Sequence, residues 1–315
     1  MLISVQGTGK IRVPVLLGPT AVGKTDLALQ LACELDMEII SCDSRQIYRG
    51  MDIGTAKPGP EQLRQVRHWM IDIADPSEEF SCFRFSRDAE AIIRQRAGIG
   101  KRTLICGGSG LYFKSLCEGL GPDVEASPAI RGKYWEQARL RGNRSVFDEL
   151  ARVDPLTASG SHPSNVKRNI RALEVYCATG LPLSELKKQA RPPVDIEFFI
   201  VVCVLPRQLL YQRINRRVDD MVKNGLMDEF RGLREKGHDD SAPGMQCVGY
   251  RELFAVEKNE ADFASAIDTI KQNTRNYAKR QTTWLRHQVQ GLDLDMQQGP
   301  FNQAKKRIKE FYKIL

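Results

Sequence analysis

The sequence lacks the residues and spacings of a zinc site. It contains only four histidines, and none of its eight cysteines forms a CxxC pair. Zinc sites need closely spaced Cys and His ligands, so this pattern argues against one. Several cysteines, such as Cys106 and Cys203, lie inside apolar runs, as small buried side chains do in a reducing compartment.

Long hydrophobic segments are also missing. No stretch approaches the roughly 18 apolar residues of a membrane span, and the N-terminal residues contain neither the apolar core of a signal peptide nor a basic amphipathic transit sequence. We therefore expect a cytoplasmic protein with no membrane contact. Nothing in the sequence indicates an obligate protein partner.

Acidic residues are outnumbered by basic ones. The 315 residues include 47 Lys and Arg against 39 Asp and Glu, which gives a net charge of +8 and a pI of about 9.1. Such a surplus favours a polyanionic partner. The length fits one large domain with an insertion, or two domains.

A phosphate-binding loop (P-loop) is the most informative motif present. Its residues are Gly18, Pro19, Thr20, Ala21, Val22, Gly23, Lys24 and Thr25. In a P-loop, backbone N–H groups surround a phosphate, the lysine reaches its outer oxygens, and the Ser or Thr hydroxyl holds Mg²⁺ directly or through water. A strand-like run before the loop and a helical pattern after it would place the phosphate at a helix N-terminus. The alternative is a glycine turn with a chance lysine.

Apolar runs typical of strands recur along the chain, with helical patterns between them. They cover residues 13–17, 37–40, 69–73, 103–106 and 196–205. The alternation predicts an α/β fold, with a P-loop NTPase-like parallel sheet and helices on both of its faces.

A helical insertion domain is expected at 122–195, because this stretch is polar and contains no convincing strand. The core domain would then comprise 1–121 and 196–315. Its C-terminal part should contain a helical stretch to about 235, a loop to 245, and helices from about 249 to 289.

Two polar loops follow the strands at 37–40 and 103–106. Asp43 lies just past the first, and Ser109 follows two glycines after the second. Ligands of open α/β sheets bind at the edge where the parallel strands end. There the Asp43 carboxylate could act as a general base or hold Mg²⁺ through water. The alternatives are a turn aspartate and a serine that caps the next helix.

Basic residues recur at helical spacing in three segments. The i,i+4 pairs are Arg213 with Arg217, Lys167 with Arg171, and Arg275 with Lys279; Arg168, Arg280 and Arg286 widen the last two groups. Each pair alone is typical of a solvated helix face. Near the aromatic residues Tyr250, Tyr277 and Trp284, the three faces together favour an RNA-binding surface with stacking side chains.

Taken together, these motifs resemble the tRNA dimethylallyltransferase family. The resemblance covers most of the chain and is carried by GPTAVGKT at 18–25, DSRQIYRGMDIGTAKP at 43–58, GGSGLYFKSL at 107–116, RALEVY at 171–176, QCVGYRE at 246–252 and AKRQTTWLR at 278–286. The animal and fungal members append a zinc finger that this sequence does not contain, so we expect a bacterial form.

The resemblance implies transfer of a dimethylallyl group from dimethylallyl diphosphate. The acceptor would be the exocyclic amine of the adenine 3′ of the anticodon, in tRNAs that read codons beginning with U. The P-loop would then hold the diphosphate, with Mg²⁺ bound through Thr25 as cofactor. The acceptor adenine would have to be extruded from the anticodon loop.

The resemblance also implies roles for individual residues. Asp43 would be the base. Ser109 stands where many relatives have threonine, and it would contact the departing diphosphate. Lys24, Arg213 and Arg217 would stabilise the diphosphate, and the sequence does not say which of the two arginines contacts it. The tRNA anticodon stem-loop would contact Asp43, Ser44, Arg45, Gln46, Arg131, Lys167, Arg168, Arg171, Gln246, Cys247, Val248, Gly249, Tyr250, Arg251, Arg275, Lys279, Arg280 and Arg286.

Other classes of protein share some of these motifs. A P-loop kinase of a small metabolite would use the first two, but would not need the basic C-terminal helices. An adenylate isopentenyltransferase would need neither the insertion nor the basic face at 275–286. A non-catalytic RNA-binding ATPase would need an acidic motor motif, of which the sequence shows no clear example.

Overall fold

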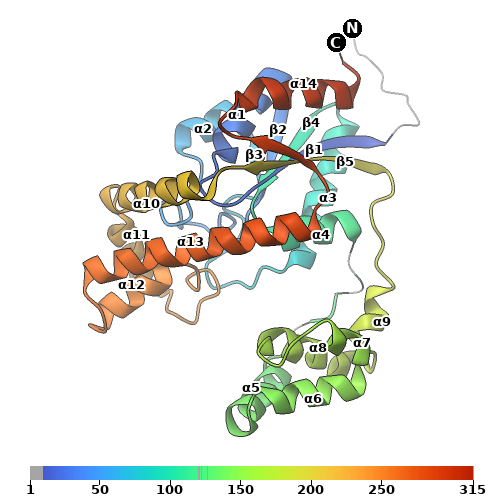
Figure 1. The fold of residues 1–315 in the computed structure, drawn as a ribbon, viewed down its shortest axis with the longest axis vertical. Coiled ribbons are helices and arrows are strands. Elements are labelled where there is room, and N and C mark those ends of the chain that lie inside the picture. Colours follow the sequence, from blue (N-terminus) through green and yellow to red (C-terminus); the bar gives the residue numbers. More distant parts are fainter. Residues whose placement is uncertain (1–9, 120, 122, 126, 315) are drawn as a thin grey trace. The chain divides into compact units, whose positions relative to one another are not determined.

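The computed structural model describes residues 10–119, 121, 123–125 and 127–314 (Figure 1). The described residues up to Leu116 and from Val194 onward form one compact unit, the core unit, and Cys117–Pro193 form a second, the helical unit. The sequence placed these boundaries a few residues later, at 121 and 195.

The core unit is built on a six-stranded parallel sheet. Its strands are β1 (Ile11–Leu17), β2 (Met37–Cys42), β3 (His68–Trp69), β4 (Arg102–Gly107), β5 (Ile196–Val204) and β6 (Leu292–Asp295), in the order β3-β2-β4-β1-β5-β6. Every neighbouring pair is parallel. The predicted α/β fold with a parallel sheet is therefore confirmed.

Helices cover both faces of this sheet, as Figure 1 shows with α1 and α14 on one side and α3 and α4 on the other. The helices of the core unit are α1 (Lys24–Leu35), α2 (Pro60–Gln65), α3 (Cys82–Gly98), α4 (Gly110–Glu118, which runs into the helical unit), α10 (Arg207–Lys223), α11 (Leu226–Glu235), α12 (Tyr250–Glu257), α13 (Phe263–Gln288) and α14 (Pro300–Tyr312). Leu27 and Leu31 of α1 pack in one core with Leu16 and Leu104 of the sheet and Ile308 of α14.

Two details of the sheet differ from the prediction. The strand expected at 69–73 is wrong, because β3 ends at Trp69 and the backbone turns through positive φ at Met70 and Asp72. The strand β6 and the helix α14 were not expected. The four residues of β6 alternate in polarity, and this pattern is too short to stand out.

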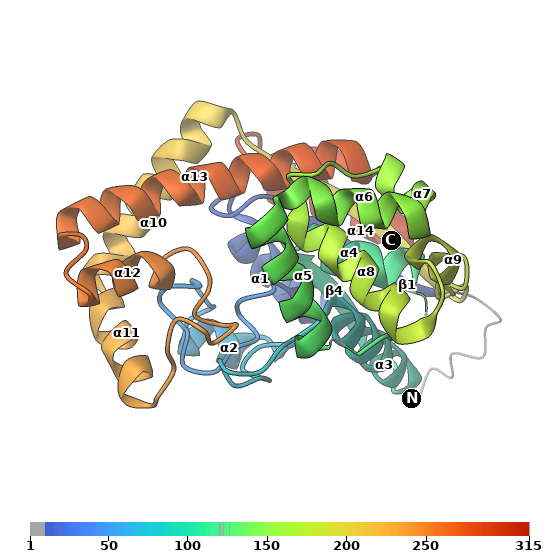
Figure 2. The ribbon, with the colours of Figure 1, turned by 90° about the horizontal axis from the view of Figure 1, so that it is seen from below.

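The helical unit contains α5 (Pro128–Arg141), α6 (Asn143–Val153), α7 (Pro155–Ser159), α8 (Val166–Thr179) and α9 (Leu183–Lys187), and no strand among its described residues. Figure 2 shows these helices from a second direction. They enclose a small core of their own, with Tyr134, Val146, Leu150, Ile170 and Leu173 almost fully buried. No helix among the described residues is both long and apolar enough to cross a bilayer.

Candidate active site

Three loops that carry chemically active side chains leave the same edge of the sheet. They follow β1, β2 and β4, which lie side by side in parallel. Since the carboxyl ends of parallel strands point the same way, the P-loop, the Asp43 loop and the Ser109 loop come together there. The sequence predicted this convergence, and the sheet order confirms it.

The P-loop joins β1 to the N-terminus of α1. Gly23 adopts a φ of +99°, and a Cβ at Gly18 would lie 2.9 Å from Cγ1 of Val22, so both positions require glycine. Among the described residues, the N–H groups of Gly23, Lys24 and Thr25 make no backbone hydrogen bond. They are the unpaired donors of a helix start, which favour an anion.

Lys24 lies inside the P-loop rather than on its surface. Its side chain is buried, and Nζ donates a hydrogen bond to the carbonyl of Pro19 at 3.2 Å. Burial lowers the pKa of Lys24, while attraction to Asp43 acts in the opposite direction. An anionic ligand would stabilise the charged form of this lysine.

The two arginines of α10 reach the P-loop at different points. Arg217 donates to the Thr20 hydroxyl at 3.4 Å, and burial lowers its pKa. Arg213 is exposed and donates to the carbonyl of Val22 at 3.0 Å. Both arginines therefore contact the P-loop.

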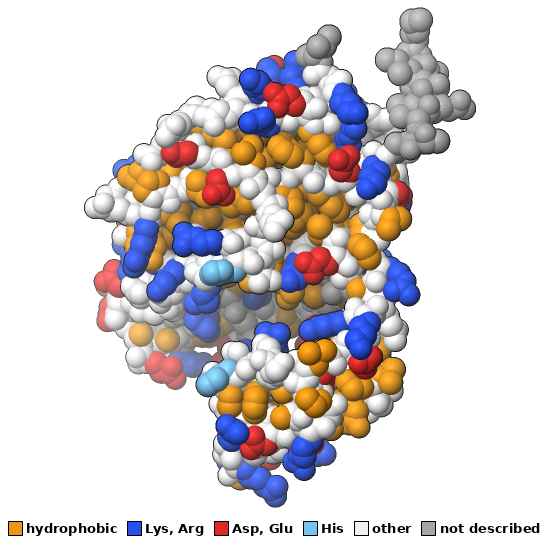
Figure 3. Space-filling view, turned by 45° about the vertical axis from the view of Figure 1, so that its right-hand side comes forward, with side chains coloured by type: hydrophobic (Ala, Val, Ile, Leu, Met, Phe, Trp, Pro, Cys, Tyr) orange, Lys and Arg blue, Asp and Glu red, His pale blue; other side chains and the backbone are white. Residues whose placement is uncertain are grey.

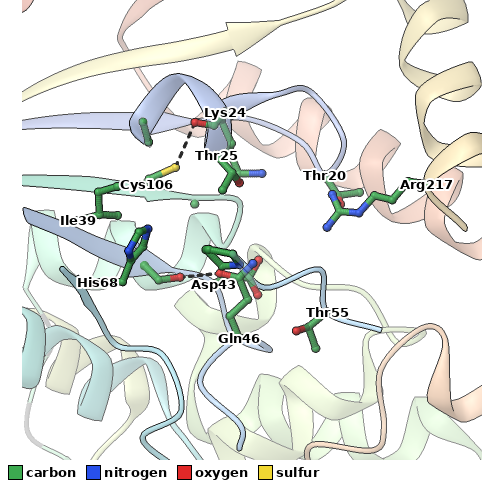
Figure 4. A pocket seen from close by; sticks show the side chains of 14 residues that line it. Thr20, Lys24, Thr25, Ile39, Asp43, Gln46, Thr55, His68, Cys106 and Arg217 are labelled. Carbon is green, nitrogen blue, oxygen red and sulfur yellow. Dashed lines mark hydrogen bonds between the residues drawn. The ribbon is translucent and has the colours of Figure 1, made fainter. Parts of the chain in front are cut away.

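A cavity of about 50 Å³ lies between the P-loop and the Asp43 loop. Figure 4 shows Thr20, Lys24, Thr25 and Arg217 around it, with Asp43 facing them. Its remaining lining is Ala28, Ile39, Ser41, Gln46, Thr55, Pro58, His68, Cys106 and Gly107. A second pocket of about 480 Å³ shares Lys24, Thr25 and Arg217 and adds Lys57 and Arg213, so it is strongly cationic.

The Asp43 loop and the Ser109 loop are hydrogen-bonded to each other. The Ser109 hydroxyl accepts from the N–H of Ser44 at 2.9 Å, and the Ser109 N–H donates to the carbonyl of Cys42 at 3.1 Å. The Ser109 hydroxyl thus contacts the Asp43 loop. Asp43 makes an Asx turn, with Oδ1 accepting from the N–H of Arg45 at 2.8 Å, while it also lines the cavity.

The side chains that follow Asp43 already have partners in the protein. Gln46 is buried, accepts from the Ser41 hydroxyl at 3.0 Å and donates to the carbonyl of Ala56 at 3.1 Å. Arg45 donates to the carbonyl of Pro243 at 2.9 Å. Their contact with a flipped base stays a prediction.

The basic residues predicted on α13 differ in exposure. Lys279, Arg280 and Arg286 are exposed, whereas Arg275 donates to Asn215 and to Gln272, both at 2.6 Å. Figure 3 shows Lys and Arg side chains on the surfaces of both units.

On α8 of the helical unit, Lys167 and Arg168 are exposed, whereas Arg171 of α8 and Arg131 of α5 lie beside a buried carboxylate. Glu174 is fully buried, accepts from Arg171 at 2.9 Å, and lies 3.5 Å from Arg131. A buried charge needs such partners. Both arginines therefore stabilise the helical unit, and their predicted contact with RNA would use the parts of their side chains that remain exposed.

The segment 246–251 corrects one expectation. Gln246 and Arg251 are exposed, and Cys247 and Val248 are half-buried. Tyr250 is fully buried and donates to Glu229 at 2.5 Å. A buried ring offers no face to a base, so the expected stacking role of Tyr250 is wrong for this structure.

Gly249 precedes this tyrosine and adopts a φ of +107°. Its N–H donates to the Glu252 carboxylate at 2.7 Å, which closes the start of α12. Gly249 and Glu252 therefore have a structural role at the start of α12.

Gln281 is a site residue to which the sequence analysis gave no role. It is buried and joins the P-loop to the Ser109 loop through the N–H of Thr20 and the carbonyl of Gly108. A signal was present, because Ala278, Gln281 and Leu285 form one buried stripe of α13. An amide inside an apolar stripe needs hydrogen-bond partners.

The fold and the site define a class of protein. A parallel α/β sheet with a P-loop at a helix N-terminus, facing a carboxylate across a cavity, is typical of enzymes that bind a diphosphate or triphosphate. The described residues include no group of three His, Cys, Asp or Glu side chains that could hold a metal.

Comparison with known proteins narrows this class to one family. The family described as IPP transferase matches residues 46–288, and the family described as isopentenyl transferase matches 11–77. A tRNA dimethylallyltransferase of Thermotoga maritima is 40% identical over 95% of this chain and 97% of its own length. One from Trichlorobacter lovleyi is 44% identical over 88% of this chain and 91% of its own length.

Solved structures agree with these relatives. A tRNA isopentenylpyrophosphate transferase of Bacillus halodurans has a TM-score of 0.68 and 38% identity, over 96% of both chains. A eukaryotic dimethylallyltransferase acting on tRNA has a TM-score of 0.79 over 96% of this chain and 80% of its own, and at 24% identity this likeness concerns the fold. The chain belongs to the tRNA dimethylallyltransferase family.

Proposed function

We propose that this protein transfers a dimethylallyl group from dimethylallyl diphosphate to tRNA. The acceptor is the N6 amine of the adenine 3′ of the anticodon, in tRNAs that read codons beginning with U. The observation that carries the proposal is that Lys24, Thr25 and Arg217 face Asp43 across one cavity. This arrangement supports diphosphate binding on one wall and proton acceptance on the other.

The donor diphosphate occupies the cationic side of the site. The open N–H groups at the start of α1 and the charges of Lys24, Arg213 and Arg217 surround this volume. These groups stabilise the negative charge that develops as the diphosphate leaves. No phosphoryl group is transferred.

The reaction exchanges one bond for another. The N6 atom of the adenine forms a bond to the allylic carbon, the bond from that carbon to the diphosphate oxygen breaks, and its electron pair leaves with the diphosphate. The N6 amine then carries an excess proton, which Asp43 accepts. The Ser109 hydroxyl accepts from the N–H of Ser44, which leaves its own hydrogen for donation to the departing oxygen.

Mg²⁺ fits this site as a cofactor. It prefers oxygen ligands, and often uses one or two protein groups together with substrate phosphates. The Thr25 hydroxyl, in the first turn of α1, lines the same cavity as Asp43. When bound, the cation would neutralise part of the diphosphate charge.

The acceptor is a tRNA anticodon stem-loop in the cytoplasm, without a membrane or an obligate protein partner. The relatives named above act on tRNA, and exposed basic residues lie on α8 and α13. Phosphate contacts from such residues give affinity, while the extruded base approaches Asp43.

One incubation tests the proposal. Purified protein, Mg²⁺ and labelled dimethylallyl diphosphate are combined with unmodified tRNA or with free AMP. We expect label in tRNA alone. Label in AMP but not in tRNA would identify an adenylate isopentenyltransferase instead, and no label in either would refute prenyl transfer.

Asp43→Ala tests the base. We expect a loss of transfer of at least about 100-fold, with donor and tRNA binding largely kept, because the P-loop and the basic faces are unchanged. Single-turnover rates and separate binding measurements for both substrates check this. Turnover near that of the wild type would remove Asp43 from the role of base.

A further inference from the structure

Gln281 connects two loops of the active site through a single side chain. It belongs to the buried face of α13 and is 8% exposed. Its Oε1 accepts from the N–H of Thr20 at 2.9 Å, and its Nε2 donates to the carbonyl of Gly108 at 2.9 Å. One amide thus bridges the P-loop after β1 and the loop after β4.

The bridge depends on close packing between α13 and the loop after β4. A Cβ at Gly108 would lie 2.4 Å from Nε2 of Gln281, and a Cβ at Gly110 would lie 2.2 Å from the ring of Trp284. Only glycine at these positions lets the helix approach so closely. The amide is therefore held between the two loops, with little room to move.

The bridge also changes which groups of the P-loop are open to a ligand. The N–H of Thr20 already donates to Gln281, and the N–H of Gly18 donates to Gly107 at 3.3 Å. Among the described residues, the N–H groups of the loop that make no backbone hydrogen bond are those of Ala21, Gly23, Lys24 and Thr25. The position of Gln281 thus helps to set where the diphosphate is held.

The contacts continue from the bridge to reacting groups on both sides. The hydroxyl of Thr20 accepts from Arg217. Beyond Gly108, the hydroxyl of Ser109 accepts from the N–H of Ser44, which is next to Asp43. The Gln281 amide, together with the hydrogen bond from the N–H of Gly18 to Gly107, therefore helps to set the separation between the diphosphate side and the base side.

We propose that Gln281 is a positioning residue that holds the P-loop and the Ser109 loop at a fixed separation and so aligns the leaving group with the acceptor amine. This inference rests on the proposed function. Displacements of about 1 Å between reacting groups can cost about 100-fold in rate. The bridge therefore acts on the chemical step more than on the binding of either substrate.

The test compares two variants of α13. Gln281→Met keeps the size of the side chain but removes both hydrogen bonds. Gln288→Met makes the same change at an exposed position near the end of the helix, where the glutamine accepts from Lys114 at 2.7 Å. Steady-state transfer to tRNA, affinity for inorganic pyrophosphate with Mg²⁺, and thermal unfolding are measured for both variants.

For Gln281→Met we expect kcat to fall by about 100-fold, while both KM values and the pyrophosphate affinity change by less than about threefold. Amide exchange at Thr20 should become faster in this variant and stay unchanged in Gln288→Met. Assays are run well below the unfolding temperature of each variant, so that loss of folded protein does not enter kcat.

Two results would overturn the inference. One is a kcat of Gln281→Met within about threefold of the wild type. The other is a loss of kcat that a lower assay temperature restores, since this would reflect stability alone. A wild-type protein that transfers no label would instead refute the proposed function, and so the two failures can be told apart.

Discussion

Arg213 and Arg217 are one helical turn apart on α10, yet their surroundings differ. Arg217 lines both the cavity that contains Asp43 and the cationic pocket, whereas Arg213 lines the cationic pocket and not that cavity. Charge stabilisation counts most where water is excluded. We therefore assign the contact with the departing diphosphate to Arg217, a choice that spacing alone could not make.

The two arginines should give different kinetic effects. We expect Arg217→Ala to lower kcat by about 100-fold or more, because charge develops on the leaving group in the transition state. Arg213→Ala should mainly raise the KM for the donor. Steady-state kinetics with varied dimethylallyl diphosphate check this, and equal losses of kcat in both variants would contradict the assignment.

Lys24 should make the binding of a diphosphate depend on pH in the alkaline range. Burial lowers its pKa in the free protein, and a bound diphosphate favours the charged form, which raises the pKa again. Binding therefore takes up a proton at pH values between the two pKa values. The affinity for inorganic pyrophosphate should fall as the pH rises through the lowered pKa, earlier than for an ordinary lysine at about 10.4.

Calorimetric titrations from neutral to alkaline pH check this dependence. Lys24→Arg keeps its charge throughout the range and serves as the control, since the titration of pyrophosphate itself is common to both proteins. If both proteins lost affinity with the same slope, Lys24 would not be the titrating group.

At the scale of elements, α11 holds the loop that follows the Asp43 segment. Glu229 accepts from the N–H groups of Asp52 and Ile53 at 2.7 Å and of Gly54 at 2.9 Å, and also from the hydroxyl of Tyr250. This loop continues to Thr55, which lines the cavity. The motifs at 43–58 and 246–252 are thus linked by one carboxylate.

Glu229→Gln should loosen this loop. An amide in place of the carboxylate leaves at least one backbone donor unpaired, at a cost of about 1–3 kcal/mol. We expect lower stability to denaturant and faster amide exchange at residues 52–54. Glu235→Gln, at the exposed end of the same helix, is the matched control, and unchanged exchange at 52–54 would show that Glu229 does not anchor the loop.

The elements that the sequence predicted well share a strong local signal. Four apolar runs became β1, β2, β4 and β5, and the P-loop sits where the motif placed it. β3 and β6 are too short to give a pattern. The buried stripe of α13 marks Gln281 as an amide that needs hydrogen-bond partners. The partners of Gln281, Glu229 and Tyr250 are distant in the sequence, and one sequence does not say which residues they are.

At the scale of the whole molecule, the positions of the basic residues indicate where tRNA could bind. Exposed basic residues occur on both units, with Lys167 and Arg168 on α8, and Lys279 and Arg280 on α13. If one tRNA contacts both units, each pair contributes phosphate contacts, and each contact adds to the salt dependence of binding.

Removing the basic pair on one unit at a time measures how much each unit contributes to tRNA binding. Replacing either pair by alanine should weaken tRNA binding and lower the slope of log affinity against log salt by about 1 per lost phosphate contact. The variant with all four substitutions should show the sum of both changes, because the two sites are independent.

The control is Lys306→Ala with Arg307→Ala, on the exposed face of α14, which removes the same charge as one pair. If the control lowered the slope equally, net charge alone would explain the effect; if only one pair changed it, the other unit would not contact the RNA.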